Sequence, residues 1–238
     1  MKTNKEVPPR SRRERPAKAA LTRQGIVDAA LTILRAEGLN KVTMRRIAEA
    51  LDTGPASLYV YVRNTTDLHI QILDALLATV TASLPAGETW REKLKQLLMR
   101  YTSVLREYPE IARMTLTMHP SGPNYLALLE QLLSLLQEGG MSDREAAWEA
   151  DLLLLYATAT AAEHSARETS SAAPEESSAL VAAIRDMDAE SHPHLARLGM
   201  DIFSGSGYSR FTWSIDVMLS GALETPRTFF EESGEWPL

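Results

Sequence analysis

The 238-residue chain contains no cysteine, which excludes a disulfide framework, a thiolate metal site and a cysteine nucleophile. It also lacks long hydrophobic runs. The longest, residues 152–162, is closed by Asp151 and Glu163 and falls short of the roughly 18 apolar residues that a membrane span needs. The N-terminal residues are rich in proline and arginine, with no apolar stretch behind them, so we expect no secretory signal. Because 45% of residues are hydrophobic, we expect a folded, soluble, cytoplasmic protein without a membrane partner.

The net charge of −6 conceals two regions of opposite sign. Residues 1–70 contain 13 Lys and Arg against 7 Asp and Glu, whereas residues 71–238 contain 12 against 24. A basic N-terminal third on an acidic remainder indicates that one end of the chain contacts a polyanion such as nucleic acid. Charge alone is equally compatible with a basic segment that only aids solubility, so both interpretations stay open.

Hydrophobic residues recur at helical spacing from residue 21 onward, and neither strand alternation nor an internal repeat is present. Gly38 is a C-terminal stop signal, Thr43 is a suitable N-cap, and Pro55 suits the first position of a helix. Asn64 and Asp67 are placed to cap the helix that follows. The first four predicted helices cover residues 21–37, 43–51, 55–61 and 64–80.

The rest of the chain is also predicted to be helical, which makes the fold class all-α. Ser142 and Glu145 have the spacing of a capping box at the start of a long helix. Residues 165–178 include five Ser and Pro174, so we expect a loop there, and residues 204–209 form a Gly/Ser connection. The predicted helical segments cover residues 90–105, 109–117, 125–138, 142–167, 175–187 and 210–224.

Two of the short helices, residues 43–51 and 55–61, are separated by a turn that contains Gly54. This arrangement is typical of a helix-turn-helix, in which the second helix enters the DNA major groove. Helix pairs with short turns are nevertheless common in α-helical proteins, so the pattern alone does not establish DNA binding.

The residues themselves are more specific. Residues 21–68 resemble the DNA-binding domain of the tetracycline repressor (TetR) family. The matching segments are LTRQGIVDAA at 21–30, EGL at 37–39, VTMRRIAE at 42–49, LYVYV at 58–62, and Asn64. A looser resemblance to the C-terminal domain of the tetracycline repressor subgroup continues through Trp90, residues 120–131 and residues 210–224.

The resemblance implies a homodimeric repressor that leaves double-stranded operator DNA when it binds a small effector. It also implies a division of the chain into four parts. These are a basic arm (1–20), a helix-turn-helix domain (21–68), an effector-binding and dimerisation domain (69–228) and a tail (229–238).

Side-chain chemistry suggests which residues meet DNA. Arg45 is the best candidate for a bidentate contact to guanine, Ser57 can hydrogen-bond base edges, and Ala56 can pack on a thymine methyl group. Hydroxyl groups of Thr43, Tyr59 and Tyr61 suit phosphate oxygens, which set register rather than sequence preference. The full predicted DNA-binding set is Thr43, Arg45, Pro55, Ala56, Ser57, Tyr59, Tyr61 and Asn64.

Several of these positions have a second interpretation. Leu58 is expected to pack between helices, and Tyr59 is expected to pack its ring while its hydroxyl reaches the DNA backbone. Many family members carry a Lys after the Asn, where this chain has Thr65, so that phosphate contact is expected to be weaker. The arm, with Arg10, Arg12, Arg13 and Arg15, is expected either to follow DNA or to remain a solvated tail.

An effector pocket is predicted mainly from the resemblance, which places Gln131 and Glu163 where the tetracycline repressor contacts its drug and magnesium. The metal-binding His of that repressor aligns with Thr115, which argues against a magnesium–tetracycline ligand. We therefore expect no cofactor or metal, and a hydrophobic aromatic or polyketide-like effector in an apolar pocket. The predicted ligand-binding residues are Leu97, Tyr101, Thr115, Met118, Gln131, Tyr156 and Glu163.

Other features carry no enzymatic chemistry. Ser204 to Gly207 lack the strand-to-helix context of a nucleophile elbow, so no enzyme is predicted. His192 and His194 flank Pro193 without a third fixed ligand, so we expect a surface loop and no metal site. The competing functions are an architectural DNA-binding protein without an effector, and a small-molecule carrier.

A dimer is predicted from two helices that are apolar on more than one side. Residues 151–163 are apolar nearly all round, and residues 210–224 have Phe211 and Ile215 on one side but Trp213 and Val217 on another. A helix with two apolar sides must be buried on both, and a two-fold axis would pair these helices in a four-helix interface. The alternative is that both are central helices of a large monomeric core.

Overall fold

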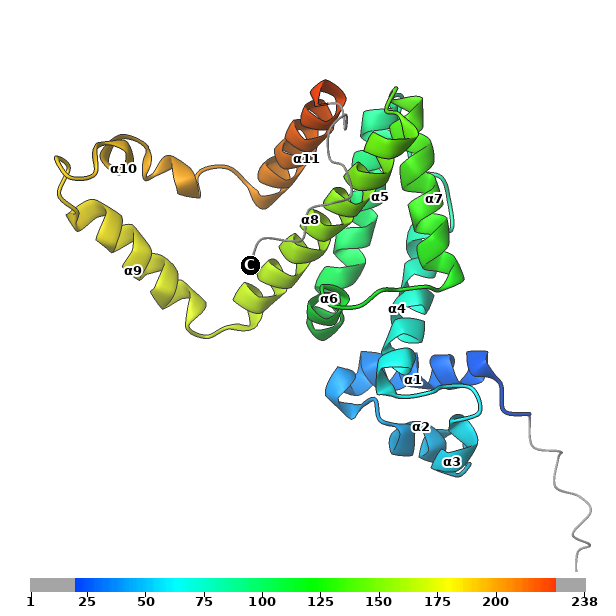
Figure 1. Ribbon diagram of the computed structural model, residues 1–238. Helices are drawn as coiled ribbons and strands as arrows, with labels where there is room; N and C mark the ends of the chain where they lie inside the picture. The colour runs from blue at the N-terminus through cyan, green and yellow to red at the C-terminus, as the bar shows by residue number, and fades with distance from the viewer. Residues whose placement is uncertain (1–19, 226–238) are drawn as a thin grey trace, which may run out of the picture. The chain divides into compact units, whose positions relative to one another are not determined.

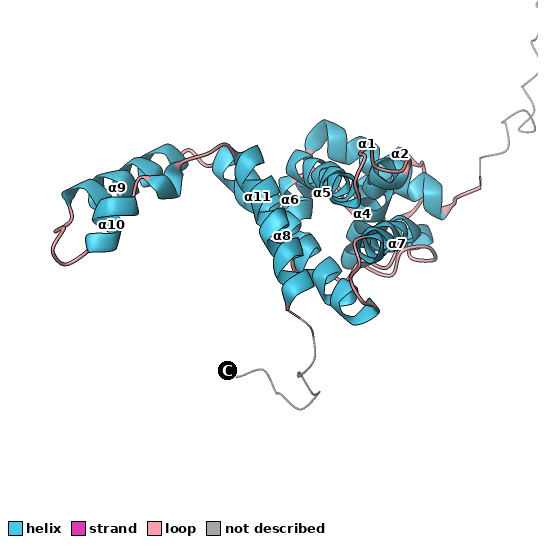
Figure 2. Cartoon of the chain, turned by 90° about the horizontal axis from the view of Figure 1, so that it is seen from above, coloured by secondary structure: helices cyan, strands magenta, loops and turns pink. Residues whose placement is uncertain are grey.

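The computed structural model describes residues 20–225, and within this range every regular element is a helix, which confirms the predicted all-α class (Figures 1 and 2). The chain divides into two compact units, with the boundary between Thr65 and Thr66. The arginines of the predicted arm and the predicted tail lie outside the described residues. None of the described helices combines the length and apolar character that crossing a membrane would demand.

The first unit contains α1 (Arg23–Glu37), η2 (Leu39–Lys41), α2 (Met44–Ala50) and α3 (Pro55–Leu58). Its helix ends follow from local chemistry. The hydroxyl groups of Thr22 and Thr43 accept backbone hydrogen bonds from Gly25 and Arg46, which begins α1 and α2 as N-caps do. Gly38 ends α1 with a φ of 85°, a left-handed value that glycine adopts without strain. Its core residues are fully buried and are Ile26, Ala30, Ile47, Leu58 and Val62.

The second unit is built around one long helix. Helix α8 (Asp143–Thr169) contacts α5 (Trp90–Glu107), α6 (Pro109–Thr115), α7 (Pro123–Glu138) and α11 (Gly207–Glu224). The unit begins with α4 (Thr65–Thr81), which follows the first unit directly in the chain. The remaining elements are α9 (Ala173–Asp186), α10 (Pro193–Leu198) and η3 (Asp201–Phe203).

Leucine at helical spacing supplies the core of this unit. These residues come from four helices, and all are fully buried: Leu77, Leu94, Leu97, Leu98, Leu105, Leu128, Leu132, Leu136 and Leu153. Burying a leucine side chain contributes about 1.5–3 kcal/mol, so packing rather than helix propensity stabilises the bundle.

Several predicted boundaries in the second unit are wrong. Residues 165–178 were expected to form a loop, but α8 continues to Thr169 and α9 begins at Ala173. The end of α8 has a tertiary cause, because Ser165 is buried and its hydroxyl donates to the carbonyl oxygen of Arg106 at 3.3 Å. His192 to His194 do not form a simple loop either, because His192 is the N-cap of α10.

Two helix starts also differ in their caps. Ser142 precedes α8 as predicted, but its side chain makes no cap hydrogen bond, so the predicted capping box is not formed there. A complete capping box is formed instead at α5, where Thr89 and Glu92 exchange hydrogen bonds with each other's backbone. Helix α11 begins at Gly207, earlier than predicted, with Ser206 as its N-cap.

Helices α9 and α10 contact each other and are drawn as neighbours in both views (Figures 1 and 2). Neither contains a buried residue. Leucines at 180, 195 and 198, together with Met200 and Ile202, are 36–52% exposed. This part of the chain therefore leaves several apolar side chains partly exposed to solvent.

Candidate functional site

The short helix α3 presents three small residues to solvent. Its last residue, Leu58, is fully buried and anchors the helix in the core of the first unit, as predicted. Pro55, Ala56 and Ser57 are exposed. A buried anchor with small exposed residues leaves the helix free to approach another surface closely.

Arg45 stands on the neighbouring helix with 85% of its side chain exposed. Its Nε donates to Glu49 Oε1 at 3.0 Å, one helical turn away. An exposed pair of this type contributes about 0.3–0.5 kcal/mol, so the guanidinium can leave Glu49 at little cost when another acceptor is offered.

The other predicted DNA-binding residues differ in exposure and in hydrogen bonding. The Thr43 hydroxyl caps α2 and accepts from the Arg46 N–H at 3.2 Å. The Tyr59 ring is 55% exposed, so the expectation that it packs between helices is wrong. Tyr61 is half-buried and Asn64 is exposed. These residues therefore offer one rigid hydroxyl and one exposed phenol.

The charge of the first unit resides mostly in its N-terminal residues. Residues 1–19 contain 7 Lys and Arg against 2 Asp and Glu, whereas residues 20–65 contain 6 against 4. The helical part alone is therefore only weakly basic.

A cavity of about 300 Å³ opens in the second unit between α5, α6, α7 and α8. It brings together three predicted ligand-binding residues, Tyr101, Thr115 and Met118. The other lining residues are Leu116, Thr117, His119, Pro120, Tyr125, Asp151, Leu154, Leu155 and Thr158. We call this the α5–α8 pocket.

Two phenols, Tyr101 and Tyr125, are among the polar groups of the α5–α8 pocket. Tyr101 is buried, and its hydroxyl oxygen lies 2.8 Å from the Thr158 hydroxyl. Burial raises the pKa of Tyr101 well above its ordinary value. The pKa of Tyr125 is also raised, first by burial and second by the charge of Asp151. Both phenols therefore remain neutral at physiological pH and can hydrogen-bond a carbonyl or hydroxyl group of a ligand.

Four predicted ligand-binding residues do not line the α5–α8 pocket. Leu97 is fully buried in the core. Gln131 donates from Nε2 to the Thr81 carbonyl oxygen at 3.3 Å, while its Oε1 is buried without a partner. Tyr156 stacks on Phe211 of α11, with ring centroids 5.6 Å apart.

The fourth, Glu163, is exposed and pairs with Arg167 at 2.7 Å, one turn along α8. No group of three or more His, Asp or Glu residues suited to a metal ion is found within residues 20–225. Three lining residues of the α5–α8 pocket were not predicted from the sequence, namely Tyr125, Asp151 and Thr158. The one available signal was Asp151, a charged residue directly before the apolar run of α8.

A second cavity, of about 600 Å³, lies between α5, α8 and the start of α11. Its walls include His164, the ion pair between Arg106 and Glu168 at 2.7 Å, and the rings of Tyr208 and Phe211. Arg106 and Glu168 pair with each other there, and Glu107 adds a second carboxylate to the lining.

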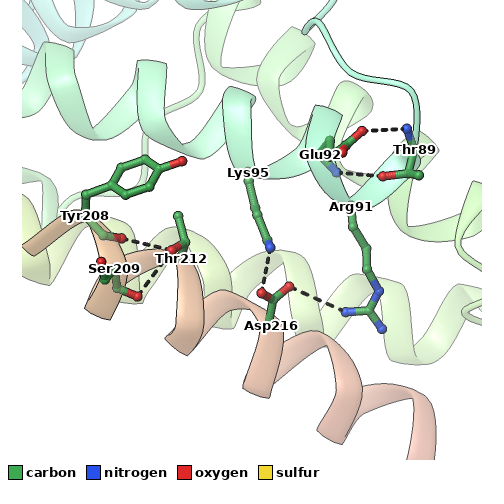
Figure 3. Close-up of polar contacts among 8 residues, drawn as sticks. All are labelled: Thr89, Arg91, Glu92, Lys95, Tyr208, Ser209, Thr212 and Asp216. Atoms are coloured by element: carbon green, nitrogen blue, oxygen red, sulfur yellow. Dashed lines mark hydrogen bonds and ion pairs between the residues drawn. The ribbon is translucent and has the colours of Figure 1, made fainter. Parts of the chain in front are cut away.

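Ion pairs join helix α11 to α5. Lys95 Nζ lies 2.6 Å from Asp216 Oδ2, and Arg91 Nη1 lies 4.0 Å from Asp216 Oδ1 (Figure 3). Beside this contact, Trp213 is 67% and Val217 is 49% exposed. On α8, three further apolar side chains are about half exposed, namely Trp148, Leu152 and Leu155.

The same two regions match known protein families. Residues 26–72 match the model for bacterial regulatory proteins of the tetR family, and residues 84–225 match that for the tetracycline repressor-like C-terminal domain. The chain belongs to the TetR family. The resemblance noted from the residues is thereby confirmed.

Solved structures of transcription regulators are similar over nearly the whole chain. The Streptomyces transcription regulator SCO7704 is 48% identical, over 88% of this chain and 98% of that one, with a TM-score of 0.72. ActR from Streptomyces coelicolor, in complex with actinorhodin, is 34% identical over 86% of this chain and 96% of that one, with a TM-score of 0.76.

Curated relatives are matched over a shorter stretch. The transcriptional repressor DrrR1 of Streptomyces coeruleorubidus is 31% identical over 56% of this chain and 50% of that one. The chain thus spans about half the length of the curated relatives that it matches.

Proposed function

We propose that the protein is a ligand-responsive transcriptional regulator, and not an enzyme, that binds a palindromic DNA operator as a homodimer in the cytoplasm. The observation that carries the proposal is the exposed surface of α3, with Arg45 beside it, in a chain of the TetR family. Phosphate contacts come from Thr43, Tyr59, Tyr61 and Asn64 in this account, and base contacts from the residues of α3 and Arg45.

The exposed apolar surface of α8 and α11 supports the homodimer. Trp213 and Val217 on α11 and Leu152 on α8 would be buried when two chains pair about a two-fold axis. Two symmetric DNA-binding units would then read half-sites about one helical turn apart, roughly 34–36 Å.

The α5–α8 pocket supports a small aromatic effector. Two neutral phenols, in a wall that mixes apolar side chains with threonine hydroxyls, suit a planar molecule that carries carbonyl or hydroxyl groups. ActR, a relative of similar fold, is bound to actinorhodin in its solved structure. An aromatic polyketide is therefore the effector class that we propose. Gln131, Leu97, Tyr156 and Glu163 do not line the pocket, and Tyr101, Thr115 and Met118 carry the proposed contacts.

Selection from a random duplex library tests the DNA-binding part of the proposal. The parent protein should enrich one palindromic sequence, and Arg45→Ala should bind it about 1–3 kcal/mol more weakly, with relaxed preference at one base position per half-site. Glu49→Ala, which removes only the helical partner of Arg45, is the matched control and should retain specificity. Enrichment of unrelated duplexes to the same extent would indicate an architectural protein instead.

A further inference from the structure

We propose that Asp74 is the positioning residue that transmits a change in the α5–α8 pocket to α4, the helix that follows the DNA-binding unit in the chain. This role depends on the proposed function, because it supposes that the pocket regulates DNA binding. The observations that carry it concern how α4 and the start of α7 are joined.

Asp74 lies in the middle of α4 and only 8% of it is exposed. Both of its carboxylate oxygens are used by α7. Oδ1 accepts the backbone N–H of Tyr125 at 2.9 Å, and Oδ2 accepts the side-chain amide of Asn124 at 3.0 Å. A buried carboxylate is costly unless it is hydrogen-bonded, so these two contacts strongly favour one placement of α7 against α4.

The start of α7 cannot cap itself. Its N-cap residue, Gly122, has no side chain, and Pro123 has no backbone N–H. Asp74 therefore acts as an N-cap supplied by another helix, and its negative charge lies at the positive end of the α7 dipole.

Gly122 shows how closely the start of α7 packs against α4. A Cβ added there would lie 2.1 Å from Asp74 Cγ and 2.6 Å from Asp74 Cβ, far inside van der Waals contact. The φ of Gly122 is −79°, so the absence of a side chain, and not a left-handed backbone, is what this position requires.

The residue held by Asp74 is also a wall of the pocket. Tyr125 lines the α5–α8 pocket together with Met118 and Pro120, which immediately precede α7. A ligand that displaces the backbone of this wall moves the N–H that Asp74 accepts, or breaks that hydrogen bond. Gln131 provides a second tie from α7 to α4, at the carbonyl oxygen of Thr81. Movement of α7 is thus passed to α4, which begins at Thr65, where the DNA-binding unit ends.

Four single variants test this role, with the operator duplex that the parent selects from a random library as the probe. Asp74→Ala removes both contacts, and Gly122→Ala forces a methyl group into the carboxylate. Asp74→Asn retains an acceptor for the Tyr125 N–H and should rescue the function. Gly139→Ala is the matched control at the other end of α7, because its methyl would meet the Trp90 ring at 2.7 Å without touching α4.

Operator affinity and Tm are measured for each variant, with binding recorded well below the lowest Tm. We expect Asp74→Ala and Gly122→Ala to bind the operator about fivefold or more weakly, the lower range of allosteric coupling, and Asp74→Asn and Gly139→Ala to stay within about twofold. The Tm of Gly139→Ala should fall as that of Gly122→Ala does, while only Gly122→Ala weakens operator binding. This difference separates an effect on coupling from an effect on stability.

The inference is overturned if Gly122→Ala and Gly139→Ala both lose Tm and both keep parental operator affinity, since Asp74 would then be structural only. The comparison of the two glycine variants decides this even if Asp74→Ala does not fold. A parent protein that enriches no duplex overturns the proposed function as well, whereas failure of the Asp74 role alone leaves parental binding intact.

Discussion

Glu149 provides a prediction about pH and stability. It lies on α8 with only 4% of its surface exposed, and its Oε1 has no hydrogen-bond partner. Burial raises the pKa of its carboxyl from 4.5 to about 7. The folded protein therefore holds a proton on Glu149 at pH values where the unfolded chain has already released it.

The sign and size of the effect follow from proton linkage. Between pH 4.5 and about 7 the folded state binds more protons than the unfolded state, so the free energy of unfolding falls as pH rises through this window. The full contribution is present below pH 4.5 and is lost above about pH 7. At about 1.36 kcal/mol per unit of pKa shift, the loss is slightly more than about 3 kcal/mol over the full range. We expect about 2–3 kcal/mol between pH 5 and pH 8, because part of the change falls below pH 5 and solvent reaches the carboxyl.

Urea unfolding of the parent and Glu149→Gln, at one fixed protein concentration and several pH values from 5 to 8, measures this loss. The uncharged variant lacks the titration, so it should gain about 2–3 kcal/mol on the parent as pH rises from 5 to 8. Glu163→Gln removes an exposed carboxylate from the same helix and is the matched control. A difference between parent and Glu149→Gln that is flat with pH would refute the reasoning.

Three further predictions concern the second unit. Val217→Arg places a charge on the exposed apolar face of α11 and should yield folded monomers by analytical ultracentrifugation; a parent that is itself monomeric at micromolar concentration would contradict the proposed dimer. Tyr101→Phe leaves the buried Thr158 hydroxyl without its partner and should cost about 1–2 kcal/mol in urea unfolding, and no measurable loss would contradict the buried hydrogen bond. Asp216→Ala breaks the ion pair with Lys95, and the Asp216 side chain is 43% exposed. The free energy of unfolding should therefore fall by less than about 1 kcal/mol, and by less still in high salt. A larger loss that salt does not change would contradict a solvent-screened pair.

Helix ends in the first unit could be predicted because their causes are local. Thr43 caps α2 by accepting the N–H of Arg46, three residues along the chain, and Gly38 ends α1 through its own backbone preference. The serine-rich segment after residue 165 could not be predicted in the same way. The hydrogen-bond partner of Ser165 is Arg106, which is 59 residues away in the chain.

The pocket was only partly predictable for a similar reason. Tyr101, Thr115 and Met118 gather around it, but Tyr156 does not, because residues two apart on a helix point about 200° apart and Thr158 is the one that faces Tyr101. Which side of α8 faces inward depends on how α5 and α11 pack on it. The apolar pattern of residues 151–163 contains no such information because it is apolar nearly all round.

The central claim is that an effector in the α5–α8 pocket releases the protein from DNA. Fluorescence anisotropy of the selected operator duplex, with and without saturating actinorhodin and related aromatic polyketides, tests it most directly. The account predicts that at least one compound weakens operator binding about tenfold or more, and that operator DNA weakens the affinity for that compound by the same factor. Specific operator binding that no aromatic polyketide changes would contradict the account.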